Sequence, residues 1–157
     1  MSVGDVIAAA NNRFLLRIRH PDAWRAAEQP GDGFAALQGH KYCLLTTFRR
    51  SGEPVPTPVW FGSADGCVYV RTEAASPKVK RIRSNPRVLV GPCGARGRPL
   101  GPMGEGRARV LSRSEEARAE AALEANYGLG RKLYEGAGTA MGVDLVYIEI
   151  SPTEGAR

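Results

Sequence analysis

The spacing of apolar residues divides the chain into a helical N-terminal part and a β-rich remainder. Over residues 5–19, apolar side chains recur at helical spacing with arginines between them, which predicts an amphipathic helix. The dipeptide His20-Pro21 ends it, because the residue before a proline is pushed out of the helical region. Such a helix can pack on the body of the protein, lie on a membrane surface or cover a site, and the sequence leaves these alternatives open. A second, short helix is expected from Asp32 to Gly39.

From residue 41 onward the pattern is typical of short strands joined by turns. Strands are predicted over residues 41–49, 55–61, 67–72, 88–90, 104–111 and 143–150. The first three are expected to form a meander, in which the prolines of strand 55–61 make it an edge strand or an irregular one. Two helices are inserted, over 76–85 and 112–127, and the second begins with a capping box. The pattern therefore predicts a mostly β fold, a small six-stranded antiparallel barrel with inserted helices.

Composition and charge narrow the function classes. A chain of 157 residues is one domain's worth of protein, and 22 Lys+Arg against 16 Asp+Glu give a net charge of +6. That charge suits nucleic acid, a small anionic ligand or a solvated surface. The three cysteines are odd in number and lack a CxxC motif, which disfavours a disulfide framework or a metal site and favours a cytoplasmic protein. No apolar run is long enough for a membrane span, so stable membrane insertion is not expected.

Most catalytic and nucleic-acid templates are missing from the sequence. The two histidines have no partner at metal-ligand or triad spacing. The Gly136-Ala137-Gly138 segment does not follow a strand, so it is a weak dinucleotide-binding signal. No RNA-binding aromatic motif or helix-turn-helix pattern accompanies the arginines, and nucleic-acid binding is the least favoured function.

The most informative stretch is TEAASPKVKRIRSNPR, over residues 72–87. It places the Ser76 hydroxyl and the Lys78 amine at the start of a helix, where unpaired N–H groups and the helix dipole favour a phosphate. The alternative is a capped helix with a solvated basic face. In the strand before it, Trp60 offers a flat face to a ring system, or is simply a core residue or a subunit contact.

Four segments in this order carry a family resemblance: LLTTFRRSGEPVPTPVWF, ADGCVYVRT, SPKVKRIRSNPRV and GEGRARVL. Together they resemble the pyridoxamine 5'-phosphate oxidase-like split-barrel superfamily, and most of all its branch that uses the deazaflavin coenzyme F420. The resemblance covers residues 41–112, with 143–150 as a final barrel strand. It implies an FMN-binding split β-barrel that forms a homodimer, with the cofactor in a cleft at the subunit interface.

The resemblance also implies which residues bind the cofactor. The phosphate would sit at the helix start, the strand before it would contact the ring, and the end of the next strand would contact the phosphate or the ribityl chain. The positions concerned are Thr57, Pro58, Val59, Trp60, Arg71, Thr72, Ser76, Pro77 and Lys78.

Two departures from the family pattern bear on the cofactor. Pro77 stands where the family has an arginine for the flavin phosphate, and the tryptophan of the longer C-terminal region that holds vitamin B6 is missing. The missing tryptophan disfavours the oxidation of vitamin B6. Pro77 favours F420 over FMN, because the long anionic tail of F420 could use Lys80, Arg81 and Arg83.

The resulting hypothesis is an F420-dependent oxidoreductase that transfers a hydride to a small organic acceptor, with no catalytic residue assigned. An FMN-binding reductase on the same fold is the close alternative, and a non-catalytic flavin or deazaflavin carrier is another. We divide the chain into a helical extension, residues 1–39, and a cofactor-binding barrel, residues 40–157.

Overall fold

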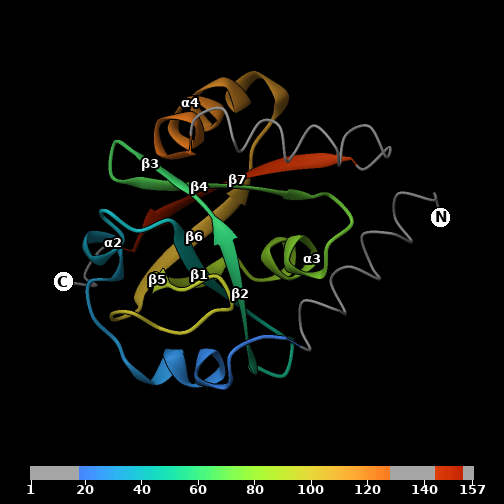
Figure 1. The fold of residues 1–157 in the computed structure, drawn as a ribbon. Helices are drawn as coiled ribbons and strands as arrows, with labels where there is room; N and C mark the ends of the chain where they lie inside the picture. The colour runs from blue at the N-terminus through green and yellow to red at the C-terminus, as the bar shows by residue number, and fades with distance from the viewer. Residues whose placement is uncertain (1–17, 128–143, 154–157) are drawn as a thin grey trace.

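Seven antiparallel strands form one sheet that curls into a half-closed barrel (Figure 1). The computed structural model describes residues 18–127 and 144–153. Its strands are β1 (Tyr42–Phe48), β2 (Pro54–Trp60), β3 (Gly62–Ala64), β4 (Cys67–Glu73), β5 (Arg87–Cys93), β6 (Gly104–Val110) and β7 (Leu145–Pro152). Their order in the sheet is β2-β1-β5-β6-β7-β4-β3. Because β2 and β3 are consecutive in the chain but lie at opposite edges, the sheet must curl until its two edges meet. This confirms the predicted split barrel, with β3 as a strand in addition to the six that were predicted.

Proline explains why β2 lies at an edge. Pro54, Pro56 and Pro58 pair with every second residue of β1, so the intervening residues make the hydrogen bonds of the ladder. The backbone positions directed away from β1 then have carbonyl oxygens but no N–H groups. Such an edge cannot pair with a further strand. The edge position predicted from the prolines is confirmed.

The predicted meander of three strands is wrong in one respect. β1 pairs with β2, and β3 pairs with β4 through a turn in which Asp65 and Gly66 both have positive φ. However, β4 pairs on its other side with β7 and not with β2. The predicted strand 55–61 is interrupted at Phe61, whose N–H donates to the Tyr127 hydroxyl (3.0 Å) and whose C=O accepts from the Asn126 side chain (2.8 Å). These contacts replace sheet pairing and leave a split between β2 and β4.

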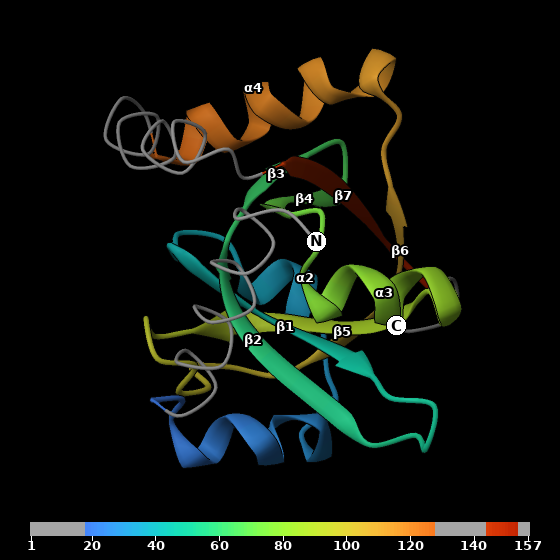
Figure 2. The same ribbon diagram turned by 90° about the vertical axis from the view of Figure 1, so that its right-hand side faces the viewer.

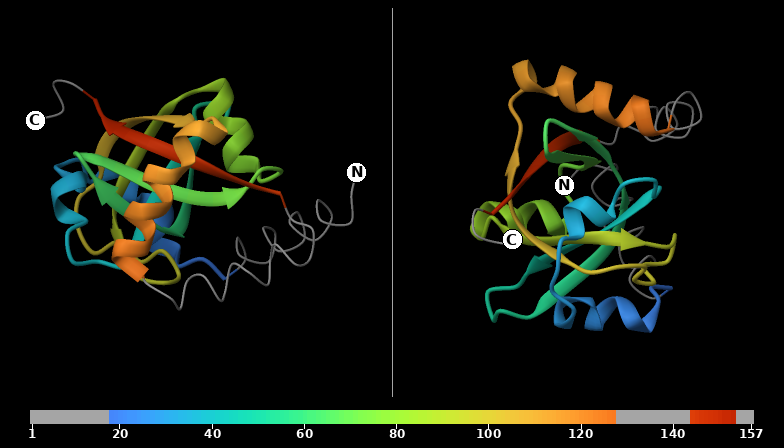
Figure 3. Two further views of the ribbon diagram at one scale, coloured as in Figure 1. Left: turned by 90° about the horizontal axis from the view of Figure 1, so that it is seen from above. Right: turned by 90° about the vertical axis from the view of Figure 1, so that its left-hand side faces the viewer.

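Helices cover the barrel on several sides (Figure 2). They are η1 (Pro21–Glu28), α2 (Gly33–Ala36), α3 (Pro77–Ser84), η2 (Arg113–Glu115) and α4 (Glu116–Tyr127). Val79 and Ile82 of α3 enter the main core between the strands, and Phe34 packs against the same core from α2. Seen from above, α4 crosses the outer face of the sheet over β3, β4 and β7 (Figure 3). The alanines of η1 pack against Leu44 on the other side of the molecule.

Most predicted elements are present with small changes of length. Asp32 caps α2 by accepting a hydrogen bond from the Ala35 N–H (3.0 Å), and the capping box before α4 is formed. The strand predicted over 88–90 extends to Cys93, and η1 was not predicted. Most of the amphipathic helix predicted over 5–19 lies outside the described residues. No helix in the described ranges is long and apolar enough to cross a membrane.

Candidate functional site

The predicted cofactor-binding residues lie on β2, on β4 and at the start of α3, around the split between β2 and β4. β3 pairs with β4 in the register Gly62↔Tyr69, so a continued β2 would bring Val59 opposite Thr72. The strands diverge there instead, and α3 begins directly beyond the end of β4 (Figure 1). The Lys78 amine connects α3 to β4, because it donates a hydrogen bond to the Thr72 hydroxyl (3.0 Å).

Side chains of the predicted site are divided between the two faces of β2. Thr57 and Val59 lie on the same face as their partners Leu45 and Cys43, which belong to the main core. Pro58 and Trp60 therefore lie on the opposite face. The same alternation along β4 puts Thr72 on the core face, with Val68 and Val70, and Arg71 on the outer face. There its guanidinium carbon lies 5.5 Å from the centre of the Tyr147 ring.

The core-facing members include a buried hydroxyl without a partner. Ser76 is the N-cap residue of α3 and is 4% exposed, yet its side chain makes no capping bond. Among the described residues its Oγ has no hydrogen-bond partner. A buried hydroxyl left in this state is costly unless something binds it. Pro77 follows at the first helical position, where its missing N–H costs nothing.

Lys78 is buried beside this hydroxyl, and the alternative of a fully solvated basic face does not apply to it. Its side chain is 7% exposed, and burial lowers its pKa to about 8. The carboxylate of Glu73 acts in the opposite direction, while the charges of Arg81 and Arg19 lower the pKa further. Burial also lowers the pKa of Arg81, whose Nε donates to the Thr47 hydroxyl (2.6 Å). An anion held here would be stabilised by cations that otherwise repel one another.

This arrangement predicts a pH dependence of anion binding. Above pH 8 the Lys78 amine is largely neutral in the ligand-free protein, so the amine must take up a proton when an anion binds. The affinity for the anion should therefore fall by up to about tenfold per pH unit. The folded pKa lies below the ordinary value of 10.5, so Lys78 itself adds stability as the pH rises from about 8 to 10.5, by up to about 3 kcal/mol. Anion titrations and urea unfolding of the parent protein and of Lys78→Met, each from pH 7 to 10, measure the two effects separately. Identical pH profiles in the two proteins would contradict them.

The aromatic end of the site contains a residue that the sequence reasoning missed. Trp60 is half-buried and stacks on Tyr127, with ring centres 5.0 Å apart and an interplanar angle of 19°. The Lys41 amine lies 5.5 Å from the centre of the Tyr127 ring. One face of Trp60 is thus covered by the end of α4. No short-range pattern links positions 60 and 127, so only the docking of α4 reveals the pair.

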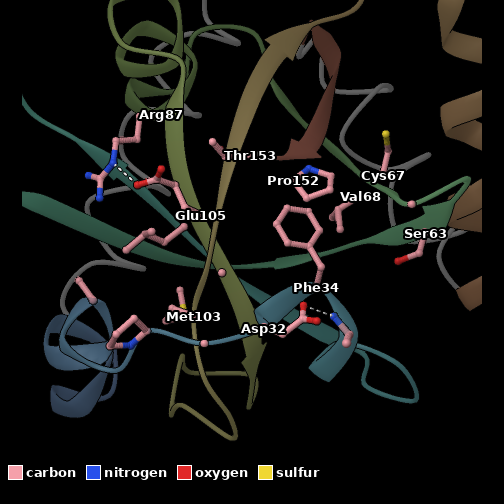
Figure 4. A pocket seen from close by; sticks show the side chains of 17 residues that line it. Asp32, Phe34, Ser63, Cys67, Val68, Arg87, Met103, Glu105, Pro152 and Thr153 are labelled. Carbon is pink, nitrogen blue, oxygen red and sulfur yellow. Dashed lines mark hydrogen bonds and ion pairs between the residues drawn. The ribbon is translucent and has the colours of Figure 1, made fainter. Parts of the chain in front are cut away.

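A large groove on the described part of the chain lies elsewhere. It has a volume of about 1500 Å³ and is lined from α2, β3, β4, β6 and the end of β7, including Phe34 and Cys67 (Figure 4). None of the nine predicted residues lines it. Its charged groups already have partners: Arg87 donates to Glu105 (2.6 Å), and Asp32 caps α2. The split offers buried polar groups to a ligand, so we place the candidate site there.

Within residues 18–127 and 144–153, no three His, Cys, Asp or Glu side chains come together as metal ligands.

Comparison with known proteins identifies the family. The model of the pyridoxamine 5'-phosphate oxidase family matches residues 34–156. The chain belongs to this family. No curated protein sequence matches it.

Solved structures show the same fold at low sequence identity. The haem storage protein HutZ from Vibrio cholerae has a TM-score of 0.58 at 16% identity, covering 77% of this chain and 87% of that one. The conserved hypothetical protein Rv2991 from Mycobacterium tuberculosis has a TM-score of 0.56 at 20% identity, with 77% and 78% covered. An FAD-binding protein from Mesorhizobium loti has a TM-score of 0.54 at 18% identity, with 76% and 84% covered. They support the split-barrel fold.

Proposed function

We propose that this protein is an oxidoreductase that binds F420 along the split and transfers a hydride to a small organic acceptor. The observation that carries the proposal is a pair of buried polar side chains at the start of α3: the Ser76 hydroxyl, which has no hydrogen-bond partner among the described residues, and the Lys78 amine two positions later. A hydroxyl, an ammonium and the unpaired N–H groups of a helix start are what a phosphate needs. In this family member, the phosphate of a flavin-like cofactor is the ligand that fits them.

The residues of the split bind and orient, and the deazaflavin supplies the hydride chemistry when it is bound. Ser76 and Lys78 hold the phosphate. Val59 and Thr57 on β2 contact the ring from the strand edge, where the proline carbonyls accept hydrogen bonds from ring N–H groups. The Trp60–Tyr127 stack forms an apolar wall at the far end, which excludes water from the ring. The homodimer expected from the resemblance is part of the proposal, with the second subunit closing the split.

FMN is the second candidate for the cofactor, because Ser76 and Lys78 can bind one phosphate and the phosphate is the only anionic group of FMN. F420 is preferred because Arg81 and the exposed Lys80 extend the positive charge beyond that pair. Pro77 adds no charge of its own.

Titration of the purified protein with F420 and with FMN tests the proposal. We expect saturable binding of F420, tighter than that of FMN, and steady oxidation of reduced F420 when a panel of conjugated acceptors is supplied. Tighter binding of FMN would make the protein an FMN reductase. Binding of either cofactor without turnover on any acceptor would favour a carrier, and binding of neither would overturn the proposal.

A further inference from the structure

Arg19 is a buried cation outside the region that the family model matches. It precedes η1, and its side chain is 5% exposed. Its Nε and Nη1 atoms are both buried, and neither has a hydrogen-bond partner in the ranges 18–127 and 144–153. The stem of the side chain lies close to Gly97: a Cβ atom placed on Gly97 would lie 3.5 Å from the Arg19 Cγ and 3.5 Å from the Leu44 Cδ1. The guanidinium carbon lies 5.9 Å from the centre of the Trp24 ring.

The charge of Arg19 acts on the candidate site. It contributes to the lowered pKa of Lys78, and Arg81 in turn contributes to the pKa of Arg19, which falls to about 10, mainly through burial. Within the part of the chain that the structure describes, none of these three cations forms an ion pair. The side chains of Leu44 and Arg19 both lie close to Gly97, and Leu44 pairs with Pro58, so Arg19 lies near the face of β2 that carries Pro58.

Two buried N–H groups without acceptors and a mutually repelling set of cations are unfavourable in the ligand-free protein. An oxyanion would supply acceptors to the N–H groups and compensate the charge. A guanidinium that only stabilised the fold would instead be found with a carboxylate or carbonyl partner.

We propose that Arg19 binds an oxyanion of the same ligand that Ser76 and Lys78 hold, so that the segment before the barrel completes the anion site. The inference rests on the proposed function. The oxyanion is the cofactor phosphate or a carboxylate of the long anionic tail of F420, and the two sources are distinguished by comparing ligands.

The test is the variant Arg19→Met, which keeps a long apolar side chain beside Trp24 and removes the charge. Arg25→Met is the matched control, because Arg25 is an exposed arginine of the neighbouring η1. Each protein is titrated with F420, FMN and inorganic pyrophosphate, and its melting temperature is measured without ligand. We expect Arg19→Met to melt at or above the parent temperature and to bind F420 at least about tenfold more weakly, while Arg25→Met behaves as the parent.

A matching loss for FMN assigns Arg19 to the phosphate, and a loss confined to F420 assigns it to the tail. Binding of both cofactors by Arg19→Met within twofold of the parent overturns the proposal, whether or not the variant is less stable. If the parent binds neither cofactor, the proposed function fails, and pyrophosphate decides the role of Arg19. In that case the parent should be stabilised by pyrophosphate and Arg19→Met should not, and equal stabilisation of both would overturn the inference.

Discussion

Lys78→Met is expected to weaken the binding of F420 and of FMN by about ten- to a hundredfold, without loss of stability. The amine makes a charge-assisted contact to the cofactor phosphate in the proposed complex, a contact that contributes about 1.5–3 kcal/mol. In the ligand-free protein the same buried charge is a cost, as its pKa of about 8 indicates. Methionine fills the space of the lysine stem, so the melting temperature at pH 7 should stay the same or rise. Calorimetric titration and thermal unfolding measure the two effects.

The control for Lys78→Met is Arg113→Met, which removes one positive charge from an exposed position on η2. It should leave the affinities for F420 and FMN within twofold of the parent. The comparison therefore separates the local contact of Lys78 with the phosphate from the effect of net charge. Ser76→Asp is the complementary change. It keeps an N-cap residue but places a negative charge beside the phosphate, so its affinity should fall at least as far as that of Lys78→Met. Parent-like binding by both site variants would contradict the placement of the phosphate at α3.

The local parts of the fold could be predicted because their causes are local. Ser112 and Glu115 form the capping box that their spacing indicates, and the prolines of β2 exclude it from the middle of a sheet. The break at Phe61 could not be predicted in this way. Its N–H and C=O are satisfied by side chains that follow more than sixty positions later. Contacts across such a separation leave no periodic signal in the sequence.

In the candidate site, too, the local features could be predicted and the features that depend on distant contacts could not. The helix start with Ser76 and Lys78 was found from a short motif, but the burial of both side chains and the missing capping bond follow from how α3 enters the core. Neighbouring residues of one strand were expected to act together, yet Thr72 and Arg71 lie on opposite faces of β4. The segment that contains Arg19 is held by the β5–β6 loop, where the Arg96 Nε donates to the Ile18 carbonyl (2.7 Å), a contact that no motif marks.

Gly62→Ala is expected to destabilise the barrel by about 3 kcal/mol, at the upper end of what overpacking costs. Gly62 opens β3 directly beneath α4. A Cβ atom there would lie 2.3 Å from the carbonyl carbon and oxygen of Ala122, and 2.5 Å from the backbone nitrogen of Leu123. These atoms belong to helix backbone and cannot rotate away, so the whole helix must shift. A loss of that size lowers the melting temperature by roughly 6–12 °C in a domain of this length.

The matched control is Gly66→Ala, in the hairpin that follows. Gly66 has φ of +79°, and a Cβ atom added there would meet nothing within 4 Å, so alanine costs only the left-handed backbone, about 1–2 kcal/mol. The two variants also differ in their effect on the site. A shift of α4 in Gly62→Ala moves Tyr127 away from Trp60 and from the Phe61 N–H, which should change the tryptophan fluorescence and the near-UV circular dichroism. Gly66→Ala should leave both signals unchanged. If Gly62→Ala melts within about 2 °C of the parent with an unaltered Trp60 signal, α4 is not held on the barrel by this close approach, and the Trp60–Tyr127 wall depends on other contacts.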